Sequence, residues 1–229
     1  MTDLIDTTEM YLRTILELEE EGQVPMRARI SERLEQSGPT VSQTVGRMER
    51  DGLVKVSGDR HLELTELGRT RAVEVMRKHR LAERLLADII GLEWEYVHEE
   101  ACRWEHVMSE RVERKILSMI DDAHLSPYGN PIPGLAELGV EVSEDFSHGV
   151  IAVTDLNHDD LKPRYELRRI GEPLQVDVAL LADLKALGIV PGAGVNICHE
   201  AGKWIIWAEG RQEGETLDPD LAMHLFVAL

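Results

Sequence analysis

The sequence has little cysteine, few aromatic residues and no long apolar run. Cys102 and Cys198 are its two cysteines, so we expect no disulfide framework, and a reducing compartment suits the chain. No stretch of about eighteen apolar residues occurs, which excludes a membrane-spanning helix of ordinary length. The first residues, MTDLID, are polar and acidic, unlike a secretion signal. We therefore predict a cytoplasmic protein with no membrane partner.

The sequence also lacks the short motifs of common hydrolases and nucleotide-binding enzymes. It contains no nucleophile elbow, no phosphate-binding P-loop and no HExxH zinc motif. Its 229 residues are enough for two or three small domains, each with its own core. We therefore predict a binding protein of several domains and not an enzyme.

Negative charge dominates the composition, with a formal net charge of −18 at pH 7. Such a balance argues against nucleic acid, because the phosphate backbone repels an acidic surface. The excess is uneven, however: residues 24–84 contain thirteen Lys and Arg but nine Asp and Glu. A basic segment in an acidic chain is what a DNA-contacting face needs. A solvated helical surface of mixed charge has the same balance, so charge leaves both interpretations open.

The first third of the chain has the pattern of a winged helix-turn-helix. Apolar spacing predicts helices over residues 7–21, 27–34 and 40–50, followed by strands at 53–56 and 61–65. Pro39 suits the first turn of the third helix, and the Gly58-Asp59 pair favours a hairpin between the strands. In such modules the helix after the turn enters the major groove of DNA.

Several polar residues of this segment fit DNA contacts. Gln43 can read adenine, while Pro39 and the methyl group of Thr40 can contact thymine methyl groups. Four arginines are candidate phosphate anchors: Arg27, Arg47, Arg50 and Arg60. A helical hairpin that only supports the fold is the alternative, but turn, polarity and wing together favour DNA binding.

The remaining sequence predicts two long helices and then a small sheet domain. Helical spacing covers residues 65–90 and 94–120, and residues 126–134 form a turn-rich linker. Short strands are predicted at 150–153, 165–169, 174–178, 195–199 and 204–208, with one helix over 180–187. Strands at this spacing indicate a small closed barrel.

Metal-ligating residues gather on the second long helix. His98, Cys102 and His106 are four residues apart, so on a continuous helix they stack on one face, beside Glu105. Imidazole, thiolate and carboxylate together make a site of intermediate softness, suited to Fe²⁺, Co²⁺, Ni²⁺ or Zn²⁺ more than to Mg²⁺ or Ca²⁺.

A second group lies on the first long helix, where His79 and Glu83 are also four residues apart. The spacing suggests two sites, one with His79, Glu83 and His98 and the other with Cys102, Glu105 and His106. A polar contact between helices, a metalloenzyme and a metal-buffering protein are the alternatives. Turnover and DNA-binding assays distinguish them.

An apolar stripe lies beside these ligands, formed by Trp94, Val97, Ala101, Trp104 and Met108. Such a stripe is most often core. It equally fits a dimer interface, which a protein that binds a palindromic DNA site requires.

Four strings of the sequence carry a resemblance to a known family: DTTEMYLR at 6–13, QSGPTVSQTV at 36–45, MRKHRLAER at 76–84 and EACRWEHVM at 100–108. Through them the chain resembles the diphtheria toxin repressor and iron-dependent regulator family of actinobacterial metal-dependent repressors. The resemblance covers the first 140 residues and is looser beyond Glu141, although residues 181–194 resemble the SH3-like module that ends such regulators.

The resemblance implies a mainly α fold with a small β part. A winged helix-turn-helix would span residues 1–73, and a helical dimerisation and metal-binding domain residues 74–140. A linker, 141–150, would precede an SH3-like β-barrel at 151–229.

The resemblance also implies functional residues. The activating metal site would comprise Met10, Cys102, Glu105 and His106, and the ancillary site His79, Glu83, His98, Glu172 and Gln175. An anion near the ancillary metal would be held by Arg80, Ser126 and Asn130. Base-facing residues would be Ser37, Pro39 and Gln43, and the DNA backbone would meet Thr7, Arg27, Ala28, Thr40, Ser42, Arg47, Arg50 and Arg60.

Met10 enters only through this resemblance, because periodicity alone places it in a core. Manganese-responsive relatives carry carboxylates at the positions of Met10 and Cys102. A thioether and a thiolate instead favour softer, later metals. We therefore expect Fe²⁺ in the cell, at two sites per subunit, with Co²⁺, Ni²⁺, Zn²⁺ or Mn²⁺ as substitutes in vitro. A Mn²⁺- or Zn²⁺-responsive repressor is the alternative.

These residues predict a mechanism. Met10 belongs to the DNA-binding part, whereas Cys102, Glu105 and His106 belong to the dimerisation part. A single ion bonded to all four would clip the two parts together and select the arrangement in which both recognition helices fit the DNA. The homodimer would then repress iron-uptake genes at palindromic operators, with one or two dimers per operator.

Overall fold

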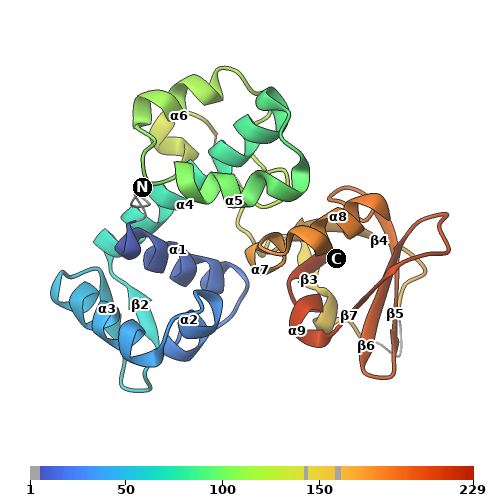
Figure 1. Cartoon of the computed structure of the whole chain (residues 1–229), viewed down its shortest axis with the longest axis horizontal. Coiled ribbons are helices and arrows are strands. Elements are labelled where there is room, and N and C mark those ends of the chain that lie inside the picture. Colours follow the sequence, from blue (N-terminus) through green and yellow to red (C-terminus); the bar gives the residue numbers. More distant parts are fainter. Residues whose placement is uncertain (1–5, 142–143, 158–160) are drawn as a thin grey trace.

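The computed structural model describes residues 6–141, 144–157 and 161–229. The chain forms three lobes that meet at the middle of the molecule (Figure 1): N-terminal helices with a hairpin, a second helical lobe and a C-terminal sheet. Within the described residues, no helix is long and apolar enough to cross a membrane. The boundaries at residues 73, 140 and 150 stay predictions.

The first lobe contains three helices whose ends are set by capping residues. They are α1 (Thr7–Glu20), α2 (Arg27–Arg33) and α3 (Gly38–Arg50). The Asp6 carboxylate accepts a hydrogen bond from Thr8 N (2.8 Å) at the start of α1. Ser37 caps α3 in the same way, and Pro39 lies in its first turn, where no backbone donor is needed.

A two-stranded hairpin completes this lobe. Strands β1 (Val54–Val56) and β2 (Leu62–Leu64) pair antiparallel, with Val54 opposite Leu64. The core beneath them is apolar and includes Tyr11, Leu12, Ile15, Ile30, Val45, Met48 and Leu62. Helix, turn, helix and hairpin therefore occur in the predicted order, and the winged helix-turn-helix is confirmed.

The first long helix of the second lobe changes its hydrogen bonding near its end. Helix α4 (Glu66–Arg84) packs against α1 and α5, and a π-helical segment, η1 (Leu85–Ile90), continues it. Gly91 ends the segment with a left-handed backbone (φ 76°). The predicted helix over 65–90 is thus continuous, but its last six residues have π-helical and not α-helical hydrogen bonding.

The predicted helix over 94–120 is wrong as a single helix. It consists of α5 (Trp94–Trp104) and α6 (Glu110–Leu117), separated by a turn. Ser109 adopts the extended backbone of an N-cap, and Glu110 starts the new helix. A serine followed by an acidic residue favours a new helix start over an extension of α5. His106, which was expected on the same face of α5 as His98 and Cys102, therefore lies in this turn instead.

The stretch 126–134 is also more than a linker. Tyr128, Asn130 and Ile132 are fully buried. The Tyr128 hydroxyl donates to Trp94 O (2.7 Å), and Tyr128 O accepts from Ile170 N (3.0 Å). The segment therefore joins α5 to the C-terminal sheet through a shared core.

The C-terminal lobe is built on one antiparallel sheet with strand order β3-β8-β4-β5-β6-β7. Its strands are β3 (Val150–Ala152), β4 (Tyr165–Ile170), β5 (Gly194–Glu200), β6 (Lys203–Ala208), β7 (Glu215–Leu217) and β8 (Leu225–Ala228). The other elements are the 3₁₀ turns η2 (Leu135–Leu138), which lies in the second lobe, and η3 (Val153–Asp155), and the helices α7 (Glu172–Gln175), α8 (Val178–Ala186) and α9 (Pro219–Ala222).

One predicted strand of this lobe is wrong, and two of its strands were not predicted. The strand expected at 174–178 is absent because Pro173 lies in the first turn of α7 and the Asp177 carboxylate caps α8. Strands β7 and β8 were not predicted. In the described residues, strand pairing leaves the sheet open between β3 and β7. Helix α9, which contacts both β7 and η3, lies between these edges.

Candidate metal centre

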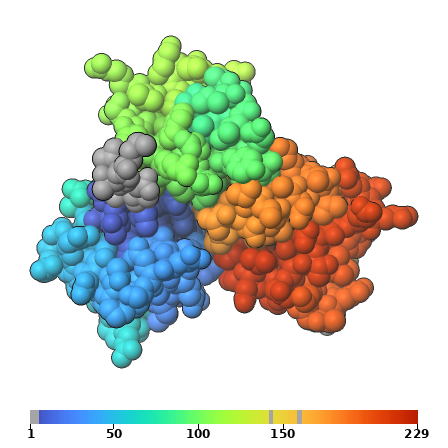
Figure 2. Space-filling model, viewed as in Figure 1, coloured from blue at the N-terminus to red at the C-terminus, as the bar shows by residue number. Residues whose placement is uncertain are grey.

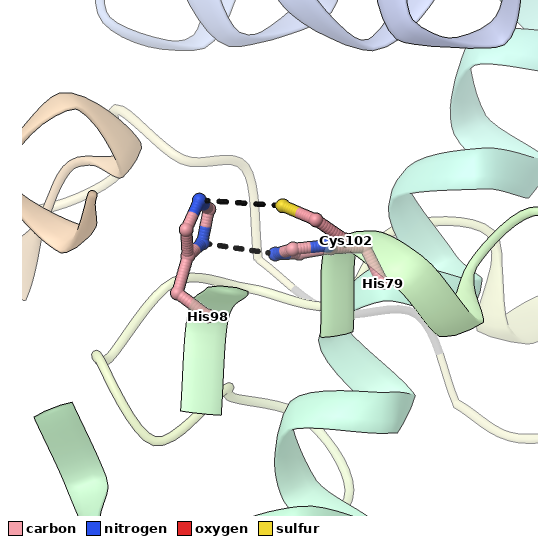
Figure 3. A group of neighbouring side chains, drawn as sticks. All are labelled: His79, His98 and Cys102. Atoms are coloured by element: carbon pink, nitrogen blue, oxygen red, sulfur yellow. Dashed lines mark hydrogen bonds between the residues drawn. The ribbon is translucent and has the colours of Figure 1, made fainter. Parts of the chain in front are cut away.

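Helices α4 and α5 bring three potential ligands together. His79 lies on α4, and His98 and Cys102 lie on α5, with ligand atoms all within 4.8 Å of one another. Figure 3 shows the three side chains pointing toward a common point. His79 Nε2 lies 3.2 Å from His98 Nδ1, and His98 Nε2 lies 3.5 Å from Cys102 Sγ. The cluster thus combines residues that were assigned to two different sites.

Glu83 completes the group expected for the ancillary site. Its Oε1 lies 2.9 Å from His79 Nε2 and 3.4 Å from His98 Nδ1. His79, His98 and Glu83 are all buried. Two imidazoles and a carboxylate at one buried point form a donor set that suits a first-row divalent metal.

Glu105 and His106 lie in the turn after α5 and face inward. His106 Nε2 and Glu105 Oε1 lie 3.3 Å apart, and both are buried with no hydrogen-bond partner among the described residues. His106 Nδ1 lies 2.7 Å from Glu9 Oε2, so donation to this carboxylate leaves the Nε2 lone pair available. A buried acceptor pair with no partner is a costly arrangement that a bound cation resolves.

Met10 lies half-buried on α1. It is one residue from Glu9 and three from Arg13, and both of these side chains contact the cluster. Met10 therefore lies on the side of α1 that faces α5. The helix of the DNA-binding lobe thus meets the ligands of the second lobe.

Arg13 contacts the cluster most extensively, although it is not among the predicted ligands. Its Nη1 lies 2.5 Å from Glu105 Oε2, 2.8 Å from His79 Nδ1 and 3.4 Å from Cys102 Sγ. A signal existed: Glu9, Arg13 and Glu17 follow one another at one-turn spacing on the first predicted helix.

The charges of the cluster shift Cys102 and Glu105 toward the deprotonated forms that bind a metal. Burial raises the pKa of the Cys102 thiol, but the positive charges of Arg13 and His98 outweigh burial and hold it well below its usual range. Burial also opposes ionisation of Glu105, yet Arg13 and His79 lower its pKa to about 2. These charges therefore favour the thiolate and the carboxylate, the forms that bind a metal.

The two histidines respond in the opposite direction. Burial favours neutral imidazole, but the Cys102 thiolate and Glu83 raise the pKa of His98 to about 9. Glu83 raises the pKa of His79 against the effect of burial. Both rings must lose a proton before they bind a metal, so protons and metal compete here.

Helix α7 of the sheet lobe packs against α5 and contains Glu172 and Gln175. Figure 2 shows the orange part of this lobe in contact with both helical lobes. Glu172 Oε1 accepts from Arg80 Nη2 (2.6 Å), and Gln175 Nε2 donates to Ile170 O (2.7 Å). Glu172 Oε2 and Gln175 Oε1 are buried without a hydrogen-bond partner in the described part of the chain. Their remaining oxygens thus suit metal ligation.

The residues expected to hold an anion are committed to protein groups. The buried Arg80 guanidinium pairs with Glu20 (Nη2 to Oε2, 2.5 Å) and Glu172. Asn130 Nδ2 donates to Ile170 O (2.9 Å), and Ser126 Oγ accepts from Tyr128 N (3.2 Å). Their role in anion binding stays a prediction.

The residues expected to contact DNA lie mainly on the surface of the first lobe. Arg27 is half-buried, and the others are exposed: Thr7, Ala28, Ser37, Pro39, Thr40, Ser42, Gln43, Arg47, Arg50 and Arg60. Helix α3 lies on the side of the molecule away from the sheet lobe (Figure 1). The proposed recognition helix is therefore accessible in this arrangement.

Two family models match the chain. Residues 3–62 match the N-terminal DNA-binding domain of iron-dependent repressors, and residues 65–134 match their metal-binding and dimerisation domain.

Named relatives cover nearly the whole chain. The diphtheria toxin repressor of Corynebacterium glutamicum is 59% identical over 92% of this chain and 91% of its own length. The iron-dependent repressor IdeR of Mycobacterium tuberculosis is 55% identical over 97% and 96%.

Solved structures share the fold. The crystal structure of IdeR from T. acidophilum has a TM-score of 0.76 at 27% identity, over 98% of each chain. A manganese-dependent transcriptional repressor, in complex with manganese, has a TM-score of 0.80 at 24% identity, over 97% of this chain and 99% of its own. With a DNA-binding lobe that reaches into a buried cluster of metal-ligating side chains, and with these relatives, the chain belongs to the diphtheria toxin repressor and IdeR family of iron-dependent repressors.

Proposed function

We propose that this protein represses transcription by binding operator DNA as an iron-activated homodimer in the cytoplasm. The observation that carries the proposal is the position of α1. This helix belongs to the winged lobe, yet Glu9 and Arg13 contact His106, Glu105, His79 and Cys102 of the second lobe. Whatever binds these ligands therefore acts directly on the position of the DNA-binding lobe.

The activating site comprises Met10, Cys102, Glu105 and His106. The unpartnered Glu105 Oε1 and His106 Nε2 support it, as do the positive charges of Arg13 and His98 that lower the pKa of the Cys102 thiol. Thioether and thiolate ligands favour Fe²⁺ over Mn²⁺. The bound ion supplies a cross-link between α1 and the turn after α5.

The ancillary site comprises His79, Glu83, His98, Glu172 and Gln175. Its support is the buried contact among the first three and the unpartnered oxygens of the last two. Because Glu172 and Gln175 come from α7, occupation of this site ties the sheet lobe to the second lobe. Shared binding energy of this kind stabilises one arrangement of the lobes.

The DNA contacts follow from the exposed end of α3. Ser37, Pro39 and Gln43 face the bases, and Arg47, Arg50 and Arg60 anchor phosphates from the helix and the wing. A palindromic operator needs two such lobes, and hence a dimer.

An apolar surface on the second lobe supports the dimer. Ile90 and Tyr96 are 55% and 46% exposed. They border a surface hollow that also includes Leu86, Leu92 and Trp104. Large apolar side chains grouped on a surface mark an interaction site. We propose that a second copy of the chain covers this surface.

The test is operator binding with and without Fe²⁺ under anaerobic conditions. The DNA is a duplex selected from a random library by the Fe²⁺-loaded protein. We expect wild type to bind it at least tenfold more tightly with Fe²⁺, and Cys102→Ala to lose this difference because it removes one ligand. Cys198→Ala serves as a control and should match wild type, because Cys198 is the chain's other cysteine and lies on β5, outside the proposed site.

Equal affinity with and without Fe²⁺ for wild type would refute the proposal. Repeating the titration with Mn²⁺ and Zn²⁺ separates an iron-responsive repressor from one that responds to those metals. A Cys102→Ala variant that responds to Fe²⁺ as wild type does would refute the assigned ligands.

A further inference from the structure

Arg13 places a permanent positive charge inside the ligand cluster. A single nitrogen, Nη1, lies within 3.4 Å of ligand atoms from Glu105, His79 and Cys102. The side chain is nearly buried, with 10% of its surface exposed. Because a guanidinium keeps its proton at any pH a folded protein survives, this charge cannot be removed by titration.

The position of this nitrogen conflicts with metal binding. Thiolate and carboxylate ligands hold a metal at about 2.0–2.3 Å. An ion bound to Cys102 Sγ and the free Glu105 Oε1 would share both residues with Arg13 Nη1, which lies 3.4 Å from Sγ and 2.5 Å from Glu105 Oε2. Two cations this close in a buried site repel strongly. Metal and guanidinium therefore compete for Cys102 and Glu105 in this arrangement.

We propose that Arg13 is an internal cation that holds the activating ligands and competes with the metal for them. Metal uptake is then an exchange, in which Arg13 withdraws from Cys102 and Glu105 as Met10, on the same helix, takes its place beside them. This inference rests on the proposed metal activation for the identity of the ligands. It adds that metal affinity is set by how readily Arg13 leaves.

A place for the withdrawn guanidinium exists next to the cluster. Arg13 Nε lies 2.9 Å from Glu17 Oε1, one turn further along α1. Both residues line a cavity of about 880 Å³ between the winged lobe and the sheet lobe. The cavity is also lined by Glu32, Glu35, Glu172 and Asp220, together with Arg29 and Arg33. A rotation toward Glu17 keeps the charge paired.

The test measures Co²⁺ binding in the absence of DNA. Co²⁺ bound to a thiolate has a charge-transfer absorption. The absorption from Cys102 therefore reports Co²⁺ binding, and competition with a chelator gives the affinity. We expect Arg13→Gln to bind Co²⁺ about tenfold more tightly than wild type, or more, because the competing charge is gone. The metal-free variant should melt at a lower temperature than wild type, and Co²⁺ should restore the melting temperature.

Arg77→Gln is the matched control. Arg77 pairs with Glu113 and Glu137 and has 4% of its side chain exposed, but no hydrogen bond or ion pair links it to a proposed ligand. It should lower the melting temperature without raising Co²⁺ affinity. A purely structural role for Arg13 predicts the same result for Arg13→Gln, so unchanged or weaker Co²⁺ binding by that variant would overturn the inference.

If Arg13→Gln does not fold, the Co²⁺ titration of Arg13→Lys tests the inference instead. A lysine keeps the charge but replaces the fork by a shorter, single ammonium group that holds fewer of the ligand atoms. We expect its Co²⁺ affinity to rise about threefold, and no rise would overturn the inference. Absence of the thiolate band in wild type would overturn the proposed site as well, whereas a normal band with no gain in either variant would overturn the role of Arg13 alone.

Discussion

The residues of the candidate metal centre differ in how far the sequence predicts them. Cys102 and His98 are four residues apart on α5, and the structure places Cys102 Sγ 3.5 Å from His98 Nε2. Met10 offers no such signal, because a methionine on a buried helix face has the spacing of core packing. Arg13 carries only the weak signal of its one-turn spacing from Glu9 and Glu17, because its partners in the cluster come from elements far along the chain.

The side chains at positions 10 and 102 should determine which metal activates the protein. We predict that the double variant Met10→Asp, Cys102→Glu shifts the preference from Fe²⁺ toward Mn²⁺, because hard carboxylates replace a thioether and a thiolate. The measurement is the ratio of the Fe²⁺ and Mn²⁺ concentrations that give half-maximal DNA binding. Wild type gives the reference ratio, and a double variant with the same ratio would contradict the assignment.

Individual elements were predictable where local signals agree. Apolar spacing, the Ser37 cap and Pro39 all indicate the same start of α3. The break between α5 and α6 was missed because the helical pattern continues across it, and only Ser109 marks the new start. This break has a consequence for function: it turns His106 toward Glu9 on α1 instead of leaving it on the face of α5.

The 126–134 segment was missed for a related reason. Its Pro and Gly residues are typical of an exposed loop. Here they shape a buried connection, because Gly129 has a left-handed backbone (φ 81°) directly against β4. The local sequence cannot show that a tertiary contact requires the turn.

The contact at Gly129 yields a stability prediction. An added Cβ would lie 1.9 Å from Arg168 O, so Gly129→Ala must displace the segment from β4. We expect a loss of about 3 kcal/mol or more in the free energy of unfolding, from backbone strain plus the clash. The control is Gly139→Ala, which has the same backbone (φ 82°) but open space around its Cβ. It should cost only about 1–2 kcal/mol. Equal midpoints in urea for the two variants would contradict the account.

At the scale of the whole molecule, the lobes meet where the candidate ligands are. Arg80 links all three lobes, because its guanidinium pairs with Glu20 of α1 and Glu172 of α7. The sequence predicted the three parts in the right order, but their mutual placement depends on such buried pairs. Those pairs join residues up to 92 positions apart, and local patterns carry no record of them.

The central claim is that one set of ligands couples metal binding to DNA binding. Thermodynamic linkage then requires each ligand to tighten the other by the same factor. The direct measurement is the Co²⁺ dissociation constant of the wild-type protein with and without saturating operator duplex, beside the duplex dissociation constant with and without Co²⁺. We predict that both constants fall, and by equal factors of about tenfold or more. A Co²⁺ dissociation constant that operator DNA leaves unchanged would contradict the account.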